Sequence, residues 1–157
     1  MAIETIEMAT VTVNDQDAAL DFYVNKAGFE KRIDNAFGPM RFLVVAPKGS
    51  RTGIVLQSAQ ANRKPTGGST GIVLGSSDVE GTYQEMSGRG VIFTQAPVKQ
   101  PWGAMEAVFS DPDGNTYSLT SQWGGKRIRN ERDLSNAMGG CHLNRKTGHP
   151  WHSCMDI

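Results

Sequence analysis

The 157-residue sequence lacks several features that would assign it to a particular class of protein. Its only two cysteines, Cys141 and Cys154, both lie near the end of the chain, which excludes a disulfide framework for the rest. No apolar run approaches the roughly 20 residues that a membrane-spanning helix needs. The first residues show no basic region followed by an apolar core, so no secretory signal is expected. We therefore expect a cytoplasmic protein.

The sequence also lacks an excess of either charge. Lys and Arg together number 16, as do Asp and Glu, so the formal net charge is zero. Nothing electrostatic therefore favours nucleic acid or an anionic membrane as a partner. All three histidines follow residue 122, which leaves residues 5–122 without the commonest transition-metal ligand.

An internal repeat is the first positive signal. Residues 37–49 align without a gap on residues 102–114, and residues 10–23 align on residues 73–86. The first alignment pairs Phe37 with Trp102, Gly38 with Gly103, Met40 with Met105, Pro47 with Pro112 and Gly49 with Gly114. We expect two copies of one structural unit, at residues 5–58 and 70–122, joined by a polar linker at residues 59–69.

The residue pattern of each copy predicts a strand, a helix and then three strands. In the first copy, apolar residues alternate with threonines over residues 8–13, which indicates a half-buried strand. Asp15 or Asn14 can cap a helix over residues 15–27 whose apolar stripe would be Ala18, Phe22 and Val24. The second copy repeats the pattern with a strand at 71–77 and a helix at 78–89.

The segment DPDGN at residues 111–115 alternates polar and turn-forming residues, which suggests either a calcium loop or a tight turn. An EF-hand loop would continue to a glutamate at its twelfth position, whereas this chain enters a strand at once. A turn is therefore expected, in which Asp111 and Asn115 bond to local backbone and Gly114 supplies a positive φ.

Two stretches resemble the vicinal oxygen chelate superfamily, the glyoxalase, bleomycin-resistance and extradiol-dioxygenase group. They are VTVNDQDAALDFYVNKAGFE at residues 11–30 and PWGAMEAVFSDPDGNTYSL at residues 101–119, and the second is typical of the bleomycin-resistance-like branch. The resemblance covers residues 5–122. It implies an α+β fold of two βαβββ modules paired into a barrel-like structure, often a homodimer, with a small molecule bound in a concave cavity.

Metal-dependent members of that superfamily hold a divalent cation with four His or Glu side chains, on the first and last strand of each module. The repeat places those positions at Met8, Val55, Gly71 and Ser118. None of these residues is a strong ligand for zinc, nickel or iron, and nearby Gln57 offers one weak oxygen. We predict that the protein has no catalytic metal and no cofactor.

Strand alternation then assigns the side chains expected to line the cavity. Arg41 and Glu106 are predicted to occupy equivalent strand positions, with Phe37 and Trp102 at the beginnings of strands, where an aromatic ring can stack on a flat ligand. The candidate ligand-binding residues are Met8, Thr10, Phe37, Arg41, Val55, Gln57, Trp102, Glu106, Ser118 and Thr120. Alternatives stay open: the threonines can face water, Trp102 can be a packing residue, and Arg41 and Glu106 can be surface charges.

Residues 123–157 fall outside the resemblance and are expected to form an extension of unknown role, with a short helix over residues 126–138. Their potential zinc ligands are Cys141, His142, His149, His152 and Cys154. The spacing matches no zinc-finger pattern, because paired CxxC ligands are absent.

Three functions remain under consideration. The first is a metal-free module that binds a small organic molecule. The second is a metal-dependent lyase, isomerase or dioxygenase of the superfamily. The third is a metal-independent enzyme in which Glu106 acts as general base, which would require a raised pKa. Whether the protein is an enzyme is not decided by the sequence.

Overall fold

The computed structural model describes residues 3–121, within a unit that spans Met1–Gln122 and is separate from Trp123–Ile157. The cysteines and histidines considered for zinc, and the helix expected at 126–138, lie outside the described residues. The first part of the chain forms β1 (Met8–Val13), α1 (Gln16–Asp21), a π-helical turn η1 (Phe22–Lys26), β2 (Glu30–Phe37), β3 (Met40–Ala46), β4 (Gly53–Ser58) and α2 (Ala59–Asn62). The second part forms β5 (Gly68–Ser76), α3 (Val79–Gly88), β6 (Ile92–Lys99), β7 (Met105–Ser110) and β8 (Asn115–Ser121).

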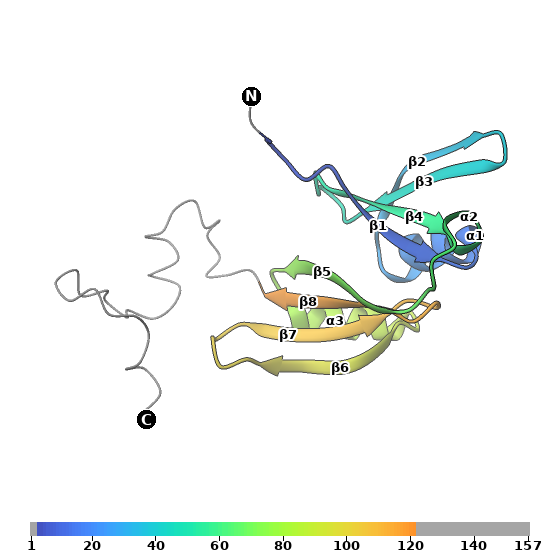
Figure 1. Cartoon of the computed structure of the whole chain (residues 1–157). Helices are drawn as coiled ribbons and strands as arrows, with labels where there is room; N and C mark the ends of the chain where they lie inside the picture. The colour runs from blue at the N-terminus through green and yellow to red at the C-terminus, as the bar shows by residue number, and fades with distance from the viewer. Residues whose placement is uncertain (1–2, 122–157) are drawn as a thin grey trace, which may run out of the picture. The chain divides into compact units, whose positions relative to one another are not determined.

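The strands form two four-stranded sheets with the same connectivity (Figure 1). The first sheet has the order β1-β4-β3-β2 and the second has the order β5-β8-β7-β6. In each sheet the first strand pairs in parallel with the last, and the remaining pairs are antiparallel. This confirms two similar βαβββ modules of an α+β fold. In the described part of the chain, the two sheets do not close into one barrel.

The first helix begins where the sequence places its cap. Asp15 has an extended backbone, and its carboxylate accepts hydrogen bonds from the amides of Asp17 and Ala18 at 2.8 and 3.0 Å. The predicted apolar stripe is partly wrong, because Ala18 is exposed and Val24 is only half-buried. The buried residues are Ala19, Phe22 and Tyr23, which follow the i, i+3, i+4 spacing of a single helix face.

Two other features differ from the sequence-based expectation. A short helix, α2, occupies the beginning of the predicted linker. The ungapped alignment of the two copies is also displaced by one residue on β3 and β7. In the sheets, Val44 lies opposite Val55 and Val108 lies opposite Ser118, so Val44 and Val108 are the equivalent residues, 64 positions apart rather than 65.

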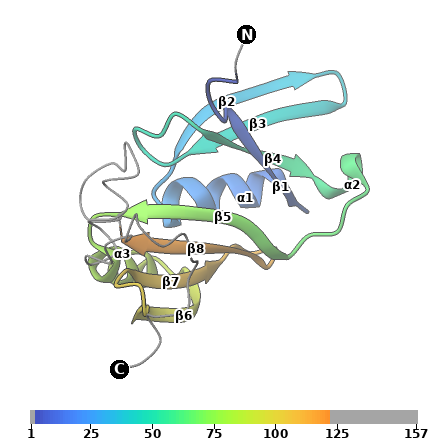
Figure 2. The same cartoon turned by 60° about the vertical axis from the view of Figure 1, so that its left-hand side comes forward.

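One hydrophobic core serves both modules. It joins residues of the first sheet and α1 to residues of the second sheet and α3, and Figure 2 shows α1 on the side of the first sheet that faces β5. Its largest fully buried side chains include Tyr23 from η1, Leu43 from β3, and Phe109 and Tyr117 from the second sheet. None of the helices formed by residues 3–121 combines the length and apolar character required to cross a bilayer.

A buried carboxylate lies at the centre of the contact between the modules. Asp111 is 5% exposed, and its Oδ1 accepts the backbone amides of Asp113 and Asn115, both at 2.9 Å. Its Oδ2 accepts the Tyr23 hydroxyl at 2.8 Å and the Asn115 side-chain amide at 2.8 Å. The Tyr23 and Tyr117 hydroxyls are 2.6 Å apart. Because the single Tyr23 hydroxyl proton goes to Asp111, Tyr117 donates to Tyr23.

Asn115 completes this inter-module junction. Its side-chain amide also donates to the Thr12 carbonyl at the end of β1 (3.0 Å), and its Oδ1 accepts the Gly67 amide (2.9 Å). Gly67 has a φ of +87°, and a Cβ there would lie 3.2 Å from the Asp113 carbonyl oxygen, so glycine suits this position. The predicted turn is confirmed, with Gly114 at φ +81° and Asp111 bonded to the local amides of Asp113 and Asn115. The expected local backbone bond of the Asn115 side chain is wrong, because this side chain bonds to the distant backbone of β1 and of the linker instead.

Removing the Tyr23 hydroxyl should weaken this junction. Tyr23→Phe leaves the Asp111 Oδ2 with one donor fewer and the buried Tyr117 hydroxyl without its acceptor. We expect the free energy of unfolding to fall by about 1–2 kcal/mol in urea denaturation. Tyr83→Phe is the matched control, because Tyr83 is half-buried and packs its ring on Phe93 at a centroid distance of 4.7 Å. An equal loss in both variants would contradict the assigned role of the junction.

The same junction predicts sensitivity to alkaline pH. Burial raises the pKa of both Tyr23 and Tyr117 above the ordinary value of 10.0. Below pH 10 these phenols are neutral in the folded and unfolded chain, so their contribution to stability is constant. Above pH 10 only the unfolded chain ionises them, and the free energy of unfolding falls. Urea titrations should show a smaller alkaline decrease in Tyr117→Phe than in the wild type, and an unchanged decrease would oppose this explanation.

Candidate functional site

Each sheet has one face that packs into the core and one that lies away from its helix, which we call the helix-distal face. On the first sheet the helix-distal face carries Met8, Thr10, Thr12, Phe42, Val44, Val55 and Gln57. On the second sheet it carries Val73, Glu106, Val108, Ser110, Thr116, Ser118 and Thr120. Strand alternation places them there, because the intervening residues are the buried members of the core.

Most of the residues predicted to bind a ligand lie on these two faces. Thr10 lies opposite Val55 on the first sheet, and Met8 and Gln57 lie two positions away along the same strands. On the second sheet, Thr120 lies directly opposite Glu106. The structure therefore gathers the predicted residues into two groups, one on each sheet.

The four positions that correspond to the superfamily's metal ligands lie on the first and last strands of the modules, and the strand pairing around them is regular only in the first module. Val55 lies opposite Thr10, and Met8 is two residues before Thr10 on the same face. Ser118 lies opposite Val73, and Gly71 is two residues before Val73. In residues 3–121 the structure contains no group of three or more His, Cys, Asp or Glu side chains arranged to hold a metal ion.

A pocket of about 240 Å³ lies on the second sheet at two of these positions. It is lined by Ser69, Gly71, Ile72, Val73, Val108, Thr116, Tyr117 and Ser118. The register between β5 and β8 shifts between Ser69 and Val73, and Gly71 within this irregularity has a φ of +69°. This local irregularity accompanies the hollow beside Ser118, whose hydroxyl makes no hydrogen bond within the described chain and remains available to a ligand.

Two aromatic residues predicted for the site lie at hairpin ends. Phe37 lies opposite Met40 at the end of the β2–β3 hairpin, and the two side chains are 61% and 57% exposed. Trp102 lies in the turn between β6 and β7 and is 51% exposed, followed by Gly103 at φ +91°. Neither ring packs into the core, so both are accessible for stacking.

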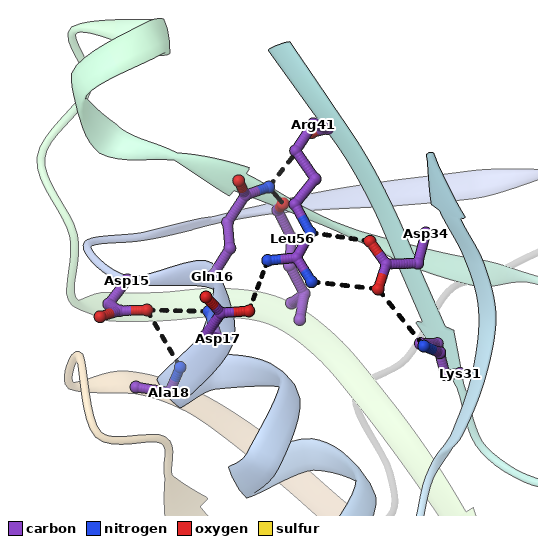
Figure 3. Close-up of polar contacts among 8 residues, drawn as sticks. All are labelled: Asp15, Gln16, Asp17, Ala18, Lys31, Asp34, Arg41 and Leu56. Carbon is purple, nitrogen blue, oxygen red and sulfur yellow. Dashed lines mark hydrogen bonds and ion pairs between the residues drawn. The ribbon is translucent and has the colours of Figure 1, made fainter. Parts of the chain in front are cut away.

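Arg41 lies on the opposite side of the first sheet, toward α1. Its Nε and Nη2 donate to Asp34 on β2 at 2.7 and 3.0 Å, and its Nη1 donates to Asp17 of α1 at 2.6 Å (Figure 3). The Gln16 side-chain amide contacts two strands, donating to the carbonyl of Arg41 on β3 at 3.2 Å and to that of Leu56 on β4 at 2.7 Å. Arg41 thus ties two strands to the helix.

The expected equivalence of Arg41 and Glu106 is wrong, and the one-residue displacement of the repeat explains why. With Val44 equivalent to Val108, the counterpart of Glu106 is Phe42 and the counterpart of Arg41 is Met105. A displacement of one residue moves a side chain to the other face of a strand. The same displacement explains why Phe42 and Val108 are absent from the residues predicted to line the cavity. Their place on the helix-distal faces follows only from the strand pairing.

Loss of Arg41 should be detectable in the titration of Asp34. The hydrogen bonds from Arg41 and, secondarily, from Lys31 lower the pKa of Asp34 from 3.8 to about 2. The contribution of Asp34 to stability is therefore present above pH 3.8 and is lost as the pH falls toward 2. In Arg41→Gln we expect the pKa of Asp34 to rise toward 3.8, measured by carboxyl carbon NMR. Arg32→Gln, which removes the partner of Glu30 on the same strand, is the control. An unchanged Asp34 pKa would contradict the ion pair.

Known proteins match this chain in sequence and in structure. A member of the glyoxalase superfamily from Sphaerobacter thermophilus DSM 20745 is 42% identical, with a TM-score of 0.73, over 76% of this chain and 98% of its own. TnmS3, an antibiotic-binding protein from Streptomyces sp. CB03234, is 37% identical, with a TM-score of 0.69, over 77% of this chain and 98% of its own. YetH, an uncharacterised protein of Bacillus subtilis strain 168, is 35% identical over 74% of this chain and 98% of its own.

The match extends to the family level and covers both modules. The model of the Glyoxalase/Bleomycin resistance protein/Dioxygenase superfamily matches residues 5–119. The duplicated βαβββ connectivity agrees with that match. The chain therefore belongs to the Glyoxalase/Bleomycin resistance protein/Dioxygenase superfamily.

Proposed function

We propose that this protein binds a small organic molecule on the helix-distal faces of its sheets, without a catalytic metal. The observation that carries the proposal is the chemistry of the four ligand-equivalent positions. Met8, Val55, Gly71 and Ser118 hold no imidazole or carboxylate, which are the side chains that divalent transition metals require there. The surrounding threonines, serines and valines make a mildly polar surface suited to an uncharged or weakly polar ligand.

Similarity to TnmS3 supports this proposal. TnmS3 is an antibiotic-binding protein, and 98% of its chain matches 77% of this chain. A planar antibiotic is therefore a reasonable first ligand class, because Trp102 and Phe37 present accessible rings. We propose residues 5–122 as the binding unit, in a cytoplasmic protein whose partners include neither nucleic acid nor membrane.

We further propose that the protein is a homodimer in which a second copy covers these faces. The two faces and their hairpin ends leave large apolar side chains in solvent within a single chain. Examples are Met8 at 46%, Phe37 at 61% and Val73 at 63% exposure. Contiguous exposed apolar residues commonly mark an interface or a ligand site. Sedimentation equilibrium is expected to give twice the chain mass.

Metal analysis and ligand screening test the proposed function together. Purified protein should contain no stoichiometric zinc, nickel, iron or manganese by mass spectrometry. Thermal-shift assays with bleomycin, doxorubicin and S-hexylglutathione should show stabilisation by at least one of them. A stoichiometric metal whose removal abolishes binding or activity would overturn the metal-free proposal, and the absence of stabilisation by all three compounds would oppose the ligand class.

Trp102→Ala should weaken binding of the stabilising compound by about 5- to 30-fold, because a stacked aromatic contributes about 1–2 kcal/mol. Trp102→Phe should retain most of the affinity, since it keeps a flat ring. Isothermal titration measures both variants. Equal losses in the two variants would show that stacking is not the contribution of Trp102.

A metal-independent enzyme is the second candidate, and the position of Glu106 favours it. Glu106 is the one carboxylate among the residues assigned to the helix-distal faces, and it is half-exposed opposite Thr120. If it removes a proton from a bound substrate, Glu106→Gln should lower kcat by about 10²-fold or more. Glu80→Gln, at an exposed position on α3, is the matched control. Any activity that survives in Glu106→Gln at wild-type level would exclude this role.

A further inference from the structure

A second and larger pocket, of about 450 Å³, lies along the outer edge of β5. From the first module it is lined by Ala27, Gly28, Phe29, Pro47, Lys48, Gly49 and Ser50. From the second module it is lined by Val73, Leu74, Gly75, Ser76, Thr82, Met86, Phe109 and Leu119. It shares only Val73 with the pocket beside Ser118.

The pocket lies along the edge of β5 and is not confined to one face of that strand. Four consecutive residues, 73–76, line it, although successive side chains of a strand point to opposite sides. Among residues 3–121, β5 is an edge strand that pairs only with β8. Part of its backbone amides and carbonyls therefore points away from β8, on the side where the pocket lies.

The floor of the pocket is apolar and comes from both modules. Phe29 follows η1, Met86 lies on α3, and Leu119 lies on β8; they are 9%, 5% and 4% exposed. Phe109 behind them is fully buried. A small apolar group would find aromatic, thioether and aliphatic contacts here, and the volume lies within the range of about 300–1,000 Å³ that is usual for small-molecule sites.

Among the residues that line the pocket, Lys48 carries the one positive charge. Arg89 lies beside the lining residue Gly28, but its guanidinium is paired with Glu85. Lys48 is exposed in the β3–β4 turn, makes no ion pair with any other described residue, and no carboxylate is among the lining residues. The rim hydroxyls already donate to the chain: Ser50 to the Thr52 carbonyl at 3.0 Å, and Thr82 to the Asp78 carbonyl at 2.6 Å. Lys48 is therefore the strongest donor available to a ligand, and it favours an anion.

We propose that this pocket is a second binding site, which shares only Val73 with the residues assigned to the helix-distal faces, for a small organic monoanion with an apolar body, such as an aryl-alkyl carboxylate. The apolar body lies on Phe29, Met86 and Leu119. The carboxylate lies at the rim, where the Lys48 ammonium and amides of the β5 edge donate to it. This site does not depend on the function proposed for the helix-distal faces.

An NMR titration of the full-length, ¹⁵N-labelled protein with 4-phenylbutyrate tests the proposal. Amide shifts should concentrate at residues 27–29, 47–50 and 73–76 and should saturate. The neutral analogue 4-phenylbutanamide should bind about threefold to tenfold more weakly, because it lacks the charge that Lys48 recognises. Saturating shifts confined to residues 8–12 and 116–120 would overturn the proposal, as would the absence of saturable shifts anywhere.

Charge variants at the rim complete the test. Lys48→Gln should reduce the affinity for 4-phenylbutyrate to that for 4-phenylbutanamide, and the affinity for 4-phenylbutanamide should not change. Lys48→Glu should reduce the affinity for 4-phenylbutyrate further. Lys64→Gln is the matched control, since Lys64 is an exposed lysine in the linker and does not line the pocket. Equal effects of Lys48→Gln and Lys64→Gln, or equal wild-type affinity for acid and amide, would overturn the role of Lys48.

Discussion

The buried carboxylate of Asp111 organises the contact between the two modules. A carboxylate removed from water is costly unless hydrogen bonds replace its hydration, and Asp111 accepts four, two from backbone amides and two from side chains. One donor, Tyr23, comes from the first module and is 88 positions away in the sequence. The turn at residues 111–115 therefore does more than reverse the chain. It also fixes the position of η1, β1 and the linker relative to the second sheet.

This arrangement decides which surfaces remain for function. The helix-facing sides of both sheets enter one shared core, so they cannot hold a ligand without unpacking it. The residues of the helix-distal faces are at least partly accessible, except Val44, which is 3% exposed. They carry hydroxyl, methyl and thioether groups, with Glu106 as the one carboxylate assigned to them. The same contact between modules leaves the outer edge of β5 beside the loops that follow η1 and β3, and the larger pocket forms there.

Arg41 shows how a functional expectation depends on strand pairing. From the repeat in the sequence, Arg41 is expected to occupy a strand position equivalent to that of Glu106 and to line the cavity. In the fold it faces α1 and joins Asp34 to Asp17. Surface ion pairs contribute little individually, but this guanidinium engages two carboxylates from two elements, so its role is to hold β3 and β2 against the helix. A ligand on the helix-distal face would lie on the other side of the sheet.

The sequence by itself determined the duplicated unit, the order of its elements, the Asp15 cap and the turn at residues 111–115, because these depend on local periodicity and backbone preference. It also placed Met8, Val55 and Ser118 on one kind of face, since strand alternation has a period of two. Tertiary structure alone decided the side on which Arg41 lies, the burial of Asp111 against Tyr23, and the pocket along β5. These features arise from the pairing register and from contacts between distant segments, which local pattern does not encode.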